Sequence, residues 1–335
     1  MNPIEAPGKV FLAGEYAVLD PGRPALVAAV DLKLQAVWET APRLRLIHRP
    51  SGASWESGAP PDELRFAVRA VQMASRFCGG EPGMRLIFDN DMASRHVKLG
   101  LGGSAAASVI AVRAACAAAG REITEDQVIS LALASHWVES GGSGSGGDVA
   151  ACALGGLLEV RSRIGWKSPE DVMALPPQQV AEARPLEVRR VKFPPEMRLL
   201  LAFTGRAADT RGLIAAVKAF SAGQRGLWRA RAVDIATASE ALRDALESGD
   251  QTAALDAIRR GAAAMAALGE QAKVPIATPE LLHACALAAF AGAAGKPSGS
   301  GGGDCAVILA FGDESRDRAE ATLKPYFPVF RVAPT

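Results

Sequence analysis

Three glycines and a serine fall within five residues in the segment Gly100-Leu101-Gly102-Gly103-Ser104. Glycine lacks a Cβ atom, so the backbone N–H groups of such a turn can converge on one point that an anion can approach closely. An alanine-rich run with strong helix propensity follows over residues 105–119. The unpaired N–H groups and the dipole of a helix N-terminus favour negative charge. The segment therefore predicts a phosphate site at the start of a helix.

Two further Gly/Ser-rich loops support this interpretation, because a single glycine-rich loop is more often an ordinary turn before a core helix. They cover residues 140–148 and 295–304, and each ends in an aspartate, Asp148 or Asp304. Taken alone, the first of them resembles a flexible linker. It runs directly into the small apolar residues 149–153, which a solvated linker does not need. We therefore expect an ordered loop at a functional site.

The composition describes a globular chain. Its 335 residues suggest about two domains, and 49% of them are apolar while 22% are charged. The 37 Lys and Arg residues against 36 Asp and Glu residues give a net charge of +1. This balance argues against bulk binding of nucleic acid or of an anionic membrane, but it leaves room for a local cationic pocket.

The termini and the cysteines point to the cytoplasm. Residues 1–5 lack the basic and apolar regions of a signal peptide, and no run of about 18 apolar residues is present. The five cysteines are scattered without a C-x-x-C pair, which suits a reducing compartment and argues against a disulfide framework or a zinc site. We expect a soluble cytoplasmic protein.

Periodicity and turn residues predict the strands and helices, and their order in the second half predicts an α+β layer rather than a doubly wound sheet. In the first half, strands are expected at 10–19, 27–30, 35–38, 44–48, 84–88 and 157–160, and helices at 62–78, 105–119 and from the capping box at Thr124 to about 139. In the second half, strands are expected at 186–193, 198–203, 305–311 and 328–333, and helices at 211–221, 225–248, 252–270, after Pro279 and at 314–324. Residues 51–61 and 295–304 are expected as loops. The least regular stretch, 164–185, contains four prolines, and it places the division between domains 1–170 and 171–335.

Three segments together resemble the GHMP kinases, the superfamily of galactokinase, homoserine kinase and mevalonate kinase. They are Pro7-Gly8-Lys9 through Val18, Gly100 through Ala106, and Lys296 through Asp304. The resemblance implies a two-domain fold with the active site between the domains. The N-terminal α+β domain would be like part of a ribosomal protein, and the C-terminal domain would be ferredoxin-like.

Within this superfamily the chain most resembles the phosphomevalonate kinases. The segments that carry this resemblance are Gly14 through Val18, Ser145 through Ala151, Thr204-Gly205 and Lys296 through Cys305. The resemblance implies ATP-dependent conversion of 5-phosphomevalonate to 5-diphosphomevalonate, with Mg²⁺, in isoprenoid biosynthesis. The alternatives are mevalonate kinase or another small-molecule kinase of the superfamily, a related decarboxylase, and a non-catalytic metabolite sensor on the same fold. The oligomeric state is open between a monomer and a homodimer.

The resemblance also assigns site residues. Those implied for the nucleotide are Lys98, Gly100, Leu101, Gly102, Gly103, Ser104, Ala105 and Ala106. Those implied for the acceptor are Lys9, Glu15, Tyr16, Ser145, Gly146, Ser300, Gly301 and Gly302. Ser104 is the expected Mg²⁺ ligand, although a serine there also fits a helix N-cap. The second Mg²⁺ ligand has no clear counterpart in this sequence. His136 stands near the position where mevalonate kinases carry a metal-binding glutamate, and Glu139 does not align with that glutamate.

Lys9 and Asp148 are the expected residues of the transfer centre. An alcohol acceptor needs a general base, whereas a phosphomonoester has a second pKa of about 6 and is mostly ionised at pH 7. For a phosphate acceptor the difficulty is the approach of two anions, which calls for cations. The candidates are Lys9, Lys98, Arg206 and Lys296. Asp148 then orients Lys9 and the acceptor, with the role of general base as the alternative.

Overall fold

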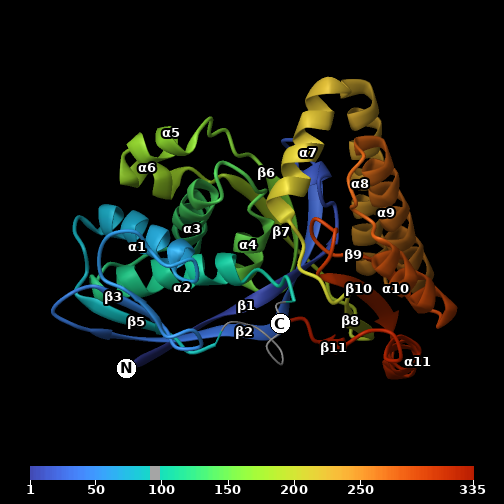
Figure 1. Cartoon of the computed structure of the whole chain (residues 1–335), viewed down its shortest axis with the longest axis horizontal. Coiled ribbons are helices and arrows are strands. Elements are labelled where there is room, and N and C mark those ends of the chain that lie inside the picture. The colour runs from blue at the N-terminus through green and yellow to red at the C-terminus, as the bar shows by residue number, and fades with distance from the viewer. Residues whose placement is uncertain (91–98) are drawn as a thin grey trace.

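The computed structural model describes residues 1–90 and 99–335, which form two sheets flanked by helices (Figure 1). The larger sheet has the strand order β4-β3-β5-β2-β6-β7, with β1 also paired to β2, and the smaller sheet has the order β11-β8-β10-β9. The larger sheet contains β1 (Asn2–Ala13), β2 (Pro24–Thr40), β3 (Arg45–His48), β4 (Ala53–Trp55), β5 (Met84–Phe88), β6 (Leu157–Ser162) and β7 (Leu186–Val191). The smaller sheet contains β8 (Met197–Phe203), β9 (Ala294–Pro297), β10 (Cys305–Phe311) and β11 (Val329–Val332). This arrangement confirms the predicted α+β class.

Helices form most of the remaining described structure. Those of the first half are α1 (Arg65–Cys78), α2 (Gly103–Ala118), α3 (Glu125–Glu139), α4 (Gly147–Leu154), α5 (Pro169–Ala174) and α6 (Pro177–Glu182), with a 3₁₀ turn at Ala17–Leu19. Those of the second half are α7 (Thr210–Gly223), α8 (Arg225–Ser248), α9 (Gln251–Ala272), α10 (Pro279–Phe290) and α11 (Asp313–Leu323). None of the helices in the described part of the chain is long and apolar enough to cross a membrane.

Strand β2 organises the larger sheet. It pairs antiparallel with β1 along most of its length, and on its other side it pairs with β5 and β6. The sequence predicted two separate strands at 27–30 and 35–38, because the polar residues Asp31 and Lys33 interrupt the apolar pattern. The structure corrects this to one strand, since Lys33 still pairs with Pro7 of β1 and continues the ladder beside a bulge.

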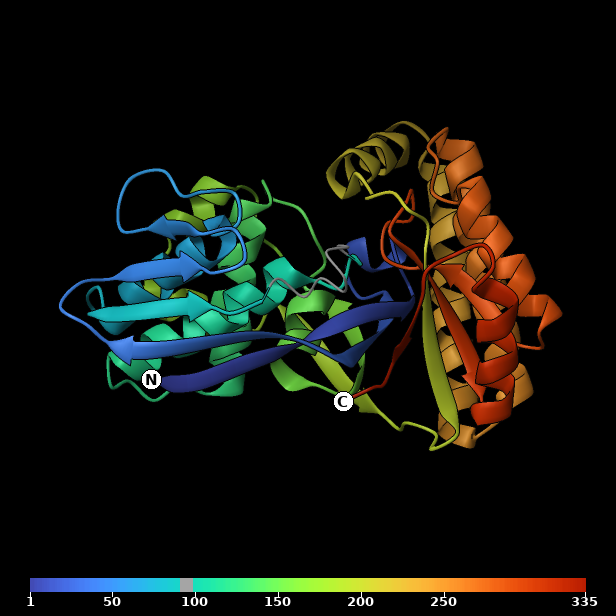
Figure 2. The same ribbon diagram turned by 60° about the horizontal axis from the view of Figure 1, so that its bottom comes forward.

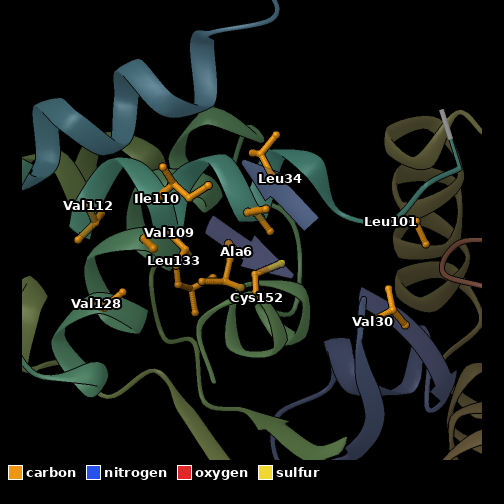
Figure 3. Packing of buried hydrophobic residues seen from close by; sticks show 14 of the residues in the cluster. Ala6, Val30, Leu34, Leu101, Val109, Ile110, Val112, Val128, Leu133 and Cys152 are labelled. Carbon is orange, nitrogen blue, oxygen red and sulfur yellow. The ribbon is translucent and has the colours of Figure 1, made fainter. Parts of the chain in front are cut away.

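Helix α2 lies at the centre of the first half. Val109, Ile110 and Val112 of α2 pack among buried residues that include Leu133 of α3 and Cys152 of α4 (Figure 3). The alanines of α2 are small, so the neighbouring helices approach closely and bury most of its residues. The loop that precedes α2 is therefore attached to a rigid element.

The smaller sheet is covered by helices on both faces, which explains the continuous apolar run of β10. Leu199, Leu201 and Val307 belong to the core cluster that also contains residues of α8 and α9. Leu200 and Ile308 point to the opposite face, where residues of α10 and α11 pack. Alternate residues of a strand face opposite sides of a sheet. A strand buried on both faces therefore needs apolar side chains at every position.

The two halves are joined more than once. Strand β7 follows the predicted division at residues 170/171 but pairs with β6 of the larger sheet. After β11 the chain returns to the larger sheet (Figure 2), where the Asp31 N–H donates to the carbonyl of Ala333 at 2.8 Å. The Thr335 N–H donates to the carbonyl of Ala29 at 3.2 Å. The exact division into domains stays a prediction of the sequence.

Several local predictions needed correction. The expected loop at 51–61 contains β4, and the irregular stretch 164–185 contains α5 and α6, each of six residues. The expected loop at 295–304 begins within β9, where Gly295 and Lys296 pair with β10. Short elements of this kind depend on a neighbouring strand or helix for their stability, so local sequence patterns identify them poorly.

Candidate active site

A cleft of about 1190 Å³ brings the three glycine-rich loops together. Its lining includes Lys9, Glu15, Tyr16, Gly100 through Ser104, His136, Ser145, Asp148, Thr210, Arg211, Ser298 through Ser300, and Asp304. Three helices, α2, α4 and α7, begin at this cleft, because Gly103, Asp148 and Thr210 lie in their first turns. Unpaired N–H groups and the helix dipole favour an anion at the starts of α2 and α4, where no side chain caps the helix, whereas the Asp209 carboxylate caps α7.

Lys9 of β1 holds the loop that precedes α2. Its backbone N–H donates to the carbonyl of Leu101 at 2.9 Å, and its Nζ donates to the carbonyl of Gly100 at 3.0 Å. Gly102 has a φ of +82°, and a Cβ atom on it would lie 2.9 Å from Lys9 Cε. Gly100 has a φ of +72°, and a Cβ atom on it would lie 2.6 Å from Asp304 Oδ2. These two glycines make room for protein side chains as well as for an anion.

Ser104 does not cap α2. The N-cap position is taken by Gly102 in a left-handed conformation, and no side chain bonds there. The alternative interpretation of Ser104 as a helix N-cap is therefore wrong, because the helix begins one residue before the serine. Instead, Ser104 Oγ lies 3.1 Å from Nε2 of His136 on α3.

His136 is buried, with 8% of its surface exposed, and stacks on the ring of Phe66 with centroids 4.8 Å apart. Burial lowers the pKa of His136; the cations Arg65, Lys9 and Arg211 lower it further, while Asp148 acts in the opposite direction. Glu139 lies one turn further along α3. Its carboxylate accepts hydrogen bonds from Arg65 at 3.2 Å and Arg69 at 3.3 Å, so it is engaged by α1.

Asp148 lies in the first turn of α4, whose N-cap is Gly146. Its Oδ1 accepts a hydrogen bond from the N–H of Val149 at 2.9 Å. Ser145 is buried beside it, and the Gly147 N–H donates to Ser145 Oγ at 3.4 Å. A Cβ atom on Gly146 would lie 2.6 Å from Leu133 Cδ2, so this glycine is required by packing. The loop is ordered, as its apolar exit predicted.

A buried network connects the first and third motifs. Glu15 forms an ion pair with Lys296, and the Tyr16 hydroxyl donates to the carbonyl of Ser300 at 2.6 Å. Tyr16 has a left-handed φ of +63°, and burial raises its pKa. Lys296 was a candidate cation for the substrate phosphates, but its side chain is 1% exposed and its charge faces Glu15.

Several other predicted residues lie outside the cleft lining. Arg206 forms an ion pair with Glu280 at the surface. A Cβ atom on Gly301 would overlap the carbonyl of Ile276, and one on Gly302 would lie 2.6 Å from Leu213 Cδ1, so packing accounts for both glycines. Ala105 and Ala106 are buried in α2 behind the loop. Lys98 lies outside the described residues.

Sequence reasoning gave no role to Asp304, Thr210 or Arg211, which line the cleft. Asp304 Oδ1 accepts a hydrogen bond from the N–H of Ala208 at 3.2 Å. Burial raises the pKa of Asp304, and the hydrogen bond from Ala208 and the charge of Lys9 oppose this rise. Arg211 donates to the carbonyl of Glu139 at 3.3 Å. The sequence shows a turn at 204–210 that leads into a helix. This turn was the signal that could have pointed to Thr210 and Arg211.

Comparison with known proteins places the chain in a family. The model of the GHMP kinases N terminal domain matches residues 65–156, and the model of the GHMP kinases C terminal domain matches residues 242–328. The chain is therefore a GHMP kinase. A phosphomevalonate kinase from Streptomyces sp. (strain CL190) is 32% identical to this chain in an alignment 351 positions long. The alignment covers 93% of this chain and 90% of the relative. Within the GHMP kinases, the chain belongs to the phosphomevalonate kinase family.

Solved structures show the same fold. The phosphomevalonate kinase of Streptococcus pneumoniae, in complex with phosphomevalonate and AMPPNP, superposes with a TM-score of 0.87 at 21% identity, over 99% of this chain and 100% of that one. The mevalonate kinase of L. major, in complex with R-mevalonate, gives a TM-score of 0.72 at 20% identity, over 100% and 97% of the two chains. Because the two superpositions cover 99% and 100% of this chain, the two-domain kinase fold describes its whole length.

Proposed function

We propose that this chain transfers the terminal phosphoryl group of ATP to the phosphate of 5-phosphomevalonate, giving 5-diphosphomevalonate and ADP in isoprenoid biosynthesis. The observation that carries the proposal is the meeting of three helix N-termini and Lys9 in one cleft. The Streptomyces relative is a phosphomevalonate kinase, and the streptococcal structure holds phosphomevalonate and AMPPNP. Both support ATP and a phosphorylated acceptor as the substrates.

The electrostatics suit a reaction between two phosphates. Each helix N-terminus carries the equivalent of about half a positive charge, and first-turn residues of α2, α4 and α7 line the cleft. An acceptor phosphate is mostly a dianion at pH 7, so its oxygen is already a nucleophile. The main barrier is then the repulsion between the acceptor and the nucleotide phosphates. Positive potential fixed by the fold lowers that barrier without reorganisation during the reaction.

We assign the individual roles from the geometry. The N–H groups of the loop and the first turn of α2, residues 100–105, bind the phosphates of ATP; the N–H of Ala106, which the sequence also suggested, already donates to the carbonyl of Gly102. Lys9 uses one of its three N–H donors on the carbonyl of Gly100, which leaves two for the phosphates at the transfer point. Asp148 faces the same region of the cleft as Lys9 and His136. It orients the acceptor and Lys9, and a phosphate acceptor needs no proton removed.

The described residues fit a Mg²⁺ ion that is held mainly by the phosphates of the enzyme's substrates. No group of three or more His, Cys, Asp or Glu residues in the described part of the chain makes a metal cage. Mg²⁺ commonly keeps several waters and binds phosphates with only one or two protein ligands. The Ser104 hydroxyl at the start of α2 supplies such a ligand. The bound ion would neutralise charge on the phosphate oxygens.

The test is ADP release measured with four acceptors: mevalonate, 5-phosphomevalonate, 5-diphosphomevalonate and homoserine. A site built for a dianion leaves its cations unpaired when mevalonate binds, so kcat/KM should favour 5-phosphomevalonate by at least ~10³-fold. Lys9→Met should reduce kcat severely, while the exposed Lys324→Met should not. Equal turnover of mevalonate would refute the choice of acceptor, and ADP release with none of the four would refute the activity.

We also propose that the protein acts in the cytoplasm as a monomer or homodimer. The five scattered cysteines, which form no C-x-x-C pair, suit a reducing compartment and support the cytoplasm.

A further inference from the structure

After β11 the chain continues as the segment Ala333-Pro334-Thr335, which lies beside β2 of the larger sheet (Figure 2). On the side away from β1, β2 pairs with β6 over residues 24–28 and with β5 over residues 36–40. The segment lies between these two partners, where Pro334 forms an antiparallel bridge with Val30. It therefore acts as a short extra strand of the larger sheet, although it follows the last strand of the smaller one.

Backbone hydrogen bonds hold the segment against β2. The Asp31 N–H donates to the Ala333 carbonyl at 2.8 Å, and the Ala333 N–H donates back to Asp31 Oδ1 at 2.9 Å. The Thr335 N–H donates to the Ala29 carbonyl at 3.2 Å, and the Ala29 N–H donates to the Gly156 carbonyl at 2.8 Å. Both backbone polar groups of Ala29 thus bond to partners outside β1.

Ala29 is the residue of β2 that lies opposite Lys9 of β1. In an antiparallel ladder, opposite residues either bond each other or point their backbone groups to the outer neighbours. Lys9 and Ala29 are of the second kind, because the Lys9 N–H donates to the Leu101 carbonyl on the outer side of β1. A row of backbone bonds and strand pairing therefore crosses the sheet from the loop before α2, through Lys9 and Ala29, to Thr335.

The ladder between β1 and β2 is irregular next to Lys9. Its register shifts between Pro7 and Gly8, which leaves Asp31 and Leu32 of β2 without an opposite residue in β1. A shift of this kind disrupts the ladder locally and changes the direction of nearby side chains. The segment bonds to Asp31 at this place, so it supports β2 where β1 does not.

We propose that segment 333–335 is a positioning element for Lys9. It fixes Ala29 and Asp31 of β2 from the outer side, and β2 fixes the part of β1 that carries Lys9. The Lys9 ammonium, which donates to the Gly100 carbonyl at 3.0 Å, is thereby held at the place where the phosphates bind. This inference rests on the proposed function, since it assigns a support to the cation that meets the nucleotide.

Hydrogen bonds, rather than burial, account for most of this attachment. Ala333 and Thr335 are exposed. A cavity of about 390 Å³ lies beside the segment, lined by Ala333 and Pro334 together with Asp31 and residues 193–195. Proline has no backbone N–H. A proline at position 333 or 335 therefore removes one of these hydrogen bonds without emptying a packed core.

The experiment measures the affinity for AMPPNP with Mg²⁺ by calorimetry, and the amide hydrogen exchange of the ligand-free protein by NMR. The variants are Ala333→Pro and Thr335→Pro. We expect each to weaken AMPPNP binding about fivefold, as the loss of one hydrogen bond would, and to speed exchange of the Lys9 N–H by a similar factor. Exchange at Ile4, which pairs with Ala36 near the other end of β1, should not change.

Two control variants match these substitutions. Thr335→Ala changes the same exposed residue but keeps its N–H. Lys33→Ala removes an exposed ion pair with Glu5, two residues along β2 from Asp31. Both should bind AMPPNP like the parent protein.

A double variant tests whether the segment acts through Lys9. Lys9→Met/Thr335→Pro should bind AMPPNP no more weakly than Lys9→Met, because the lysine that the segment positions is already gone. A segment that only stabilised the fold would weaken binding in both backgrounds. If the proline variants fail to fold, Asp31→Ala removes the acceptor of the Ala333 N–H. Asp31→Asn keeps an acceptor oxygen there and should restore the affinity.

Three results would overturn the proposal: parent-like AMPPNP affinity in the folded proline variants, additive losses in the double variant, or equally faster exchange at Lys9 and Ile4. These measurements use no acceptor. A failure to turn over 5-phosphomevalonate would therefore refute the proposed function and leave this inference to be judged on its own data.

Discussion

Glu15 and Lys296 form an ion pair whose side chains are only 3% and 1% exposed. They come from opposite ends of the sequence and meet at the wall of the cleft, which Glu15 lines together with Tyr16 and Ser300, the partners of a hydrogen bond. Glu15 Oε2 is buried without a hydrogen-bond partner among the described residues. A buried ion pair of this kind stabilises little on balance, but removal of one partner is costly.

This pair predicts a strong effect of single substitutions on stability. Lys296→Met leaves the Glu15 carboxylate buried and unpaired, so it should lower the free energy of unfolding by about 3–5 kcal/mol. The double variant Lys296→Met/Glu15→Leu should regain most of that loss, because no charge stays buried. Urea unfolding followed by circular dichroism measures both. The exposed pair Arg318–Glu314 is the control, and Arg318→Met should change stability by about 0.5 kcal/mol or less. Equal effects at the two sites would contradict the argument.

The second prediction concerns Gly102. A side chain there meets Lys9 Cε and must displace the Lys9 ammonium from the carbonyl of Gly100. Gly102→Ala should therefore abolish most activity and weaken ATP binding, and Gly102→Val should abolish ATP binding in a folded protein. Gly22 is a matched control, since its φ is +79° and nothing lies within 4 Å of its Cβ position. Gly22→Ala should cost about 1–2 kcal/mol in stability and keep full activity. Normal ATP affinity in folded Gly102→Val would show that the loop is assigned wrongly.

The third prediction separates the two roles of Asp148. If the acceptor is already ionised, Asp148→Asn should lower kcat without adding or removing a titration in the profile of kcat/KM between pH 6 and 9. Asparagine keeps the size and the acceptor oxygen that bonds the Val149 N–H. A loss of rate at the acid end of the profile that is present in the parent protein and missing in the variant would instead make Asp148 a general base.

The fourth prediction follows from the raised pKa of Asp304, which burial causes. A carboxyl whose pKa is higher in the folded than in the unfolded protein costs no stability below the unfolded pKa, about 3.8. It costs progressively more as the pH rises through the folded pKa. Asp304→Asn should therefore raise Tm at pH 7, and this gain should shrink toward pH 4.

Asp313 provides the opposite case for comparison. Its hydrogen bond with Arg198 lowers its pKa, so its ionised form stabilises the fold. Asp313→Asn should lower Tm at pH 7, and the loss should fade as the pH falls toward the folded pKa. Parallel pH trends in the two variants would show that the burial of Asp304 has no energetic effect.

Much of the fold was accessible from the sequence because its signals are local. The strands at 84–88 and 305–311 and the helix that begins after Thr124 agree with the structure, and both bonds of the predicted capping box are present. Lys9, Gly100 through Ser104 and Asp148 were predicted from glycine patterns and from resemblance, and the structure brings them to one cleft. Their catalytic and binding roles stay predictions.

What the sequence missed depends on contacts between distant segments. Lys296 looked like a free cation, since nothing near it in sequence shows that Glu15 neutralises it 281 residues away. Gly301 and Gly302 looked like ligand-binding glycines, although the Ile276 carbonyl and Leu213 account for them. Ser104 fitted an N-cap because serine favours that position, but the left-handed Gly102 shifted the helix start. His136 acquired its partner only when α2 and α3 packed together.

The convergence of α2, α4 and α7 has a practical consequence for work on the purified protein. A concave surface that presents helix N-termini to solvent attracts small oxyanions in general, because backbone N–H groups recognise charge and size before they recognise chemical identity. Inorganic phosphate, sulfate and pyrophosphate in a buffer will compete with both substrates for the same groups. They will raise the melting temperature by mass action and depress the measured rates. The choice of buffer anion is thus itself a variable of the experiment, and chloride salts with a zwitterionic buffer leave the cleft open to its substrates.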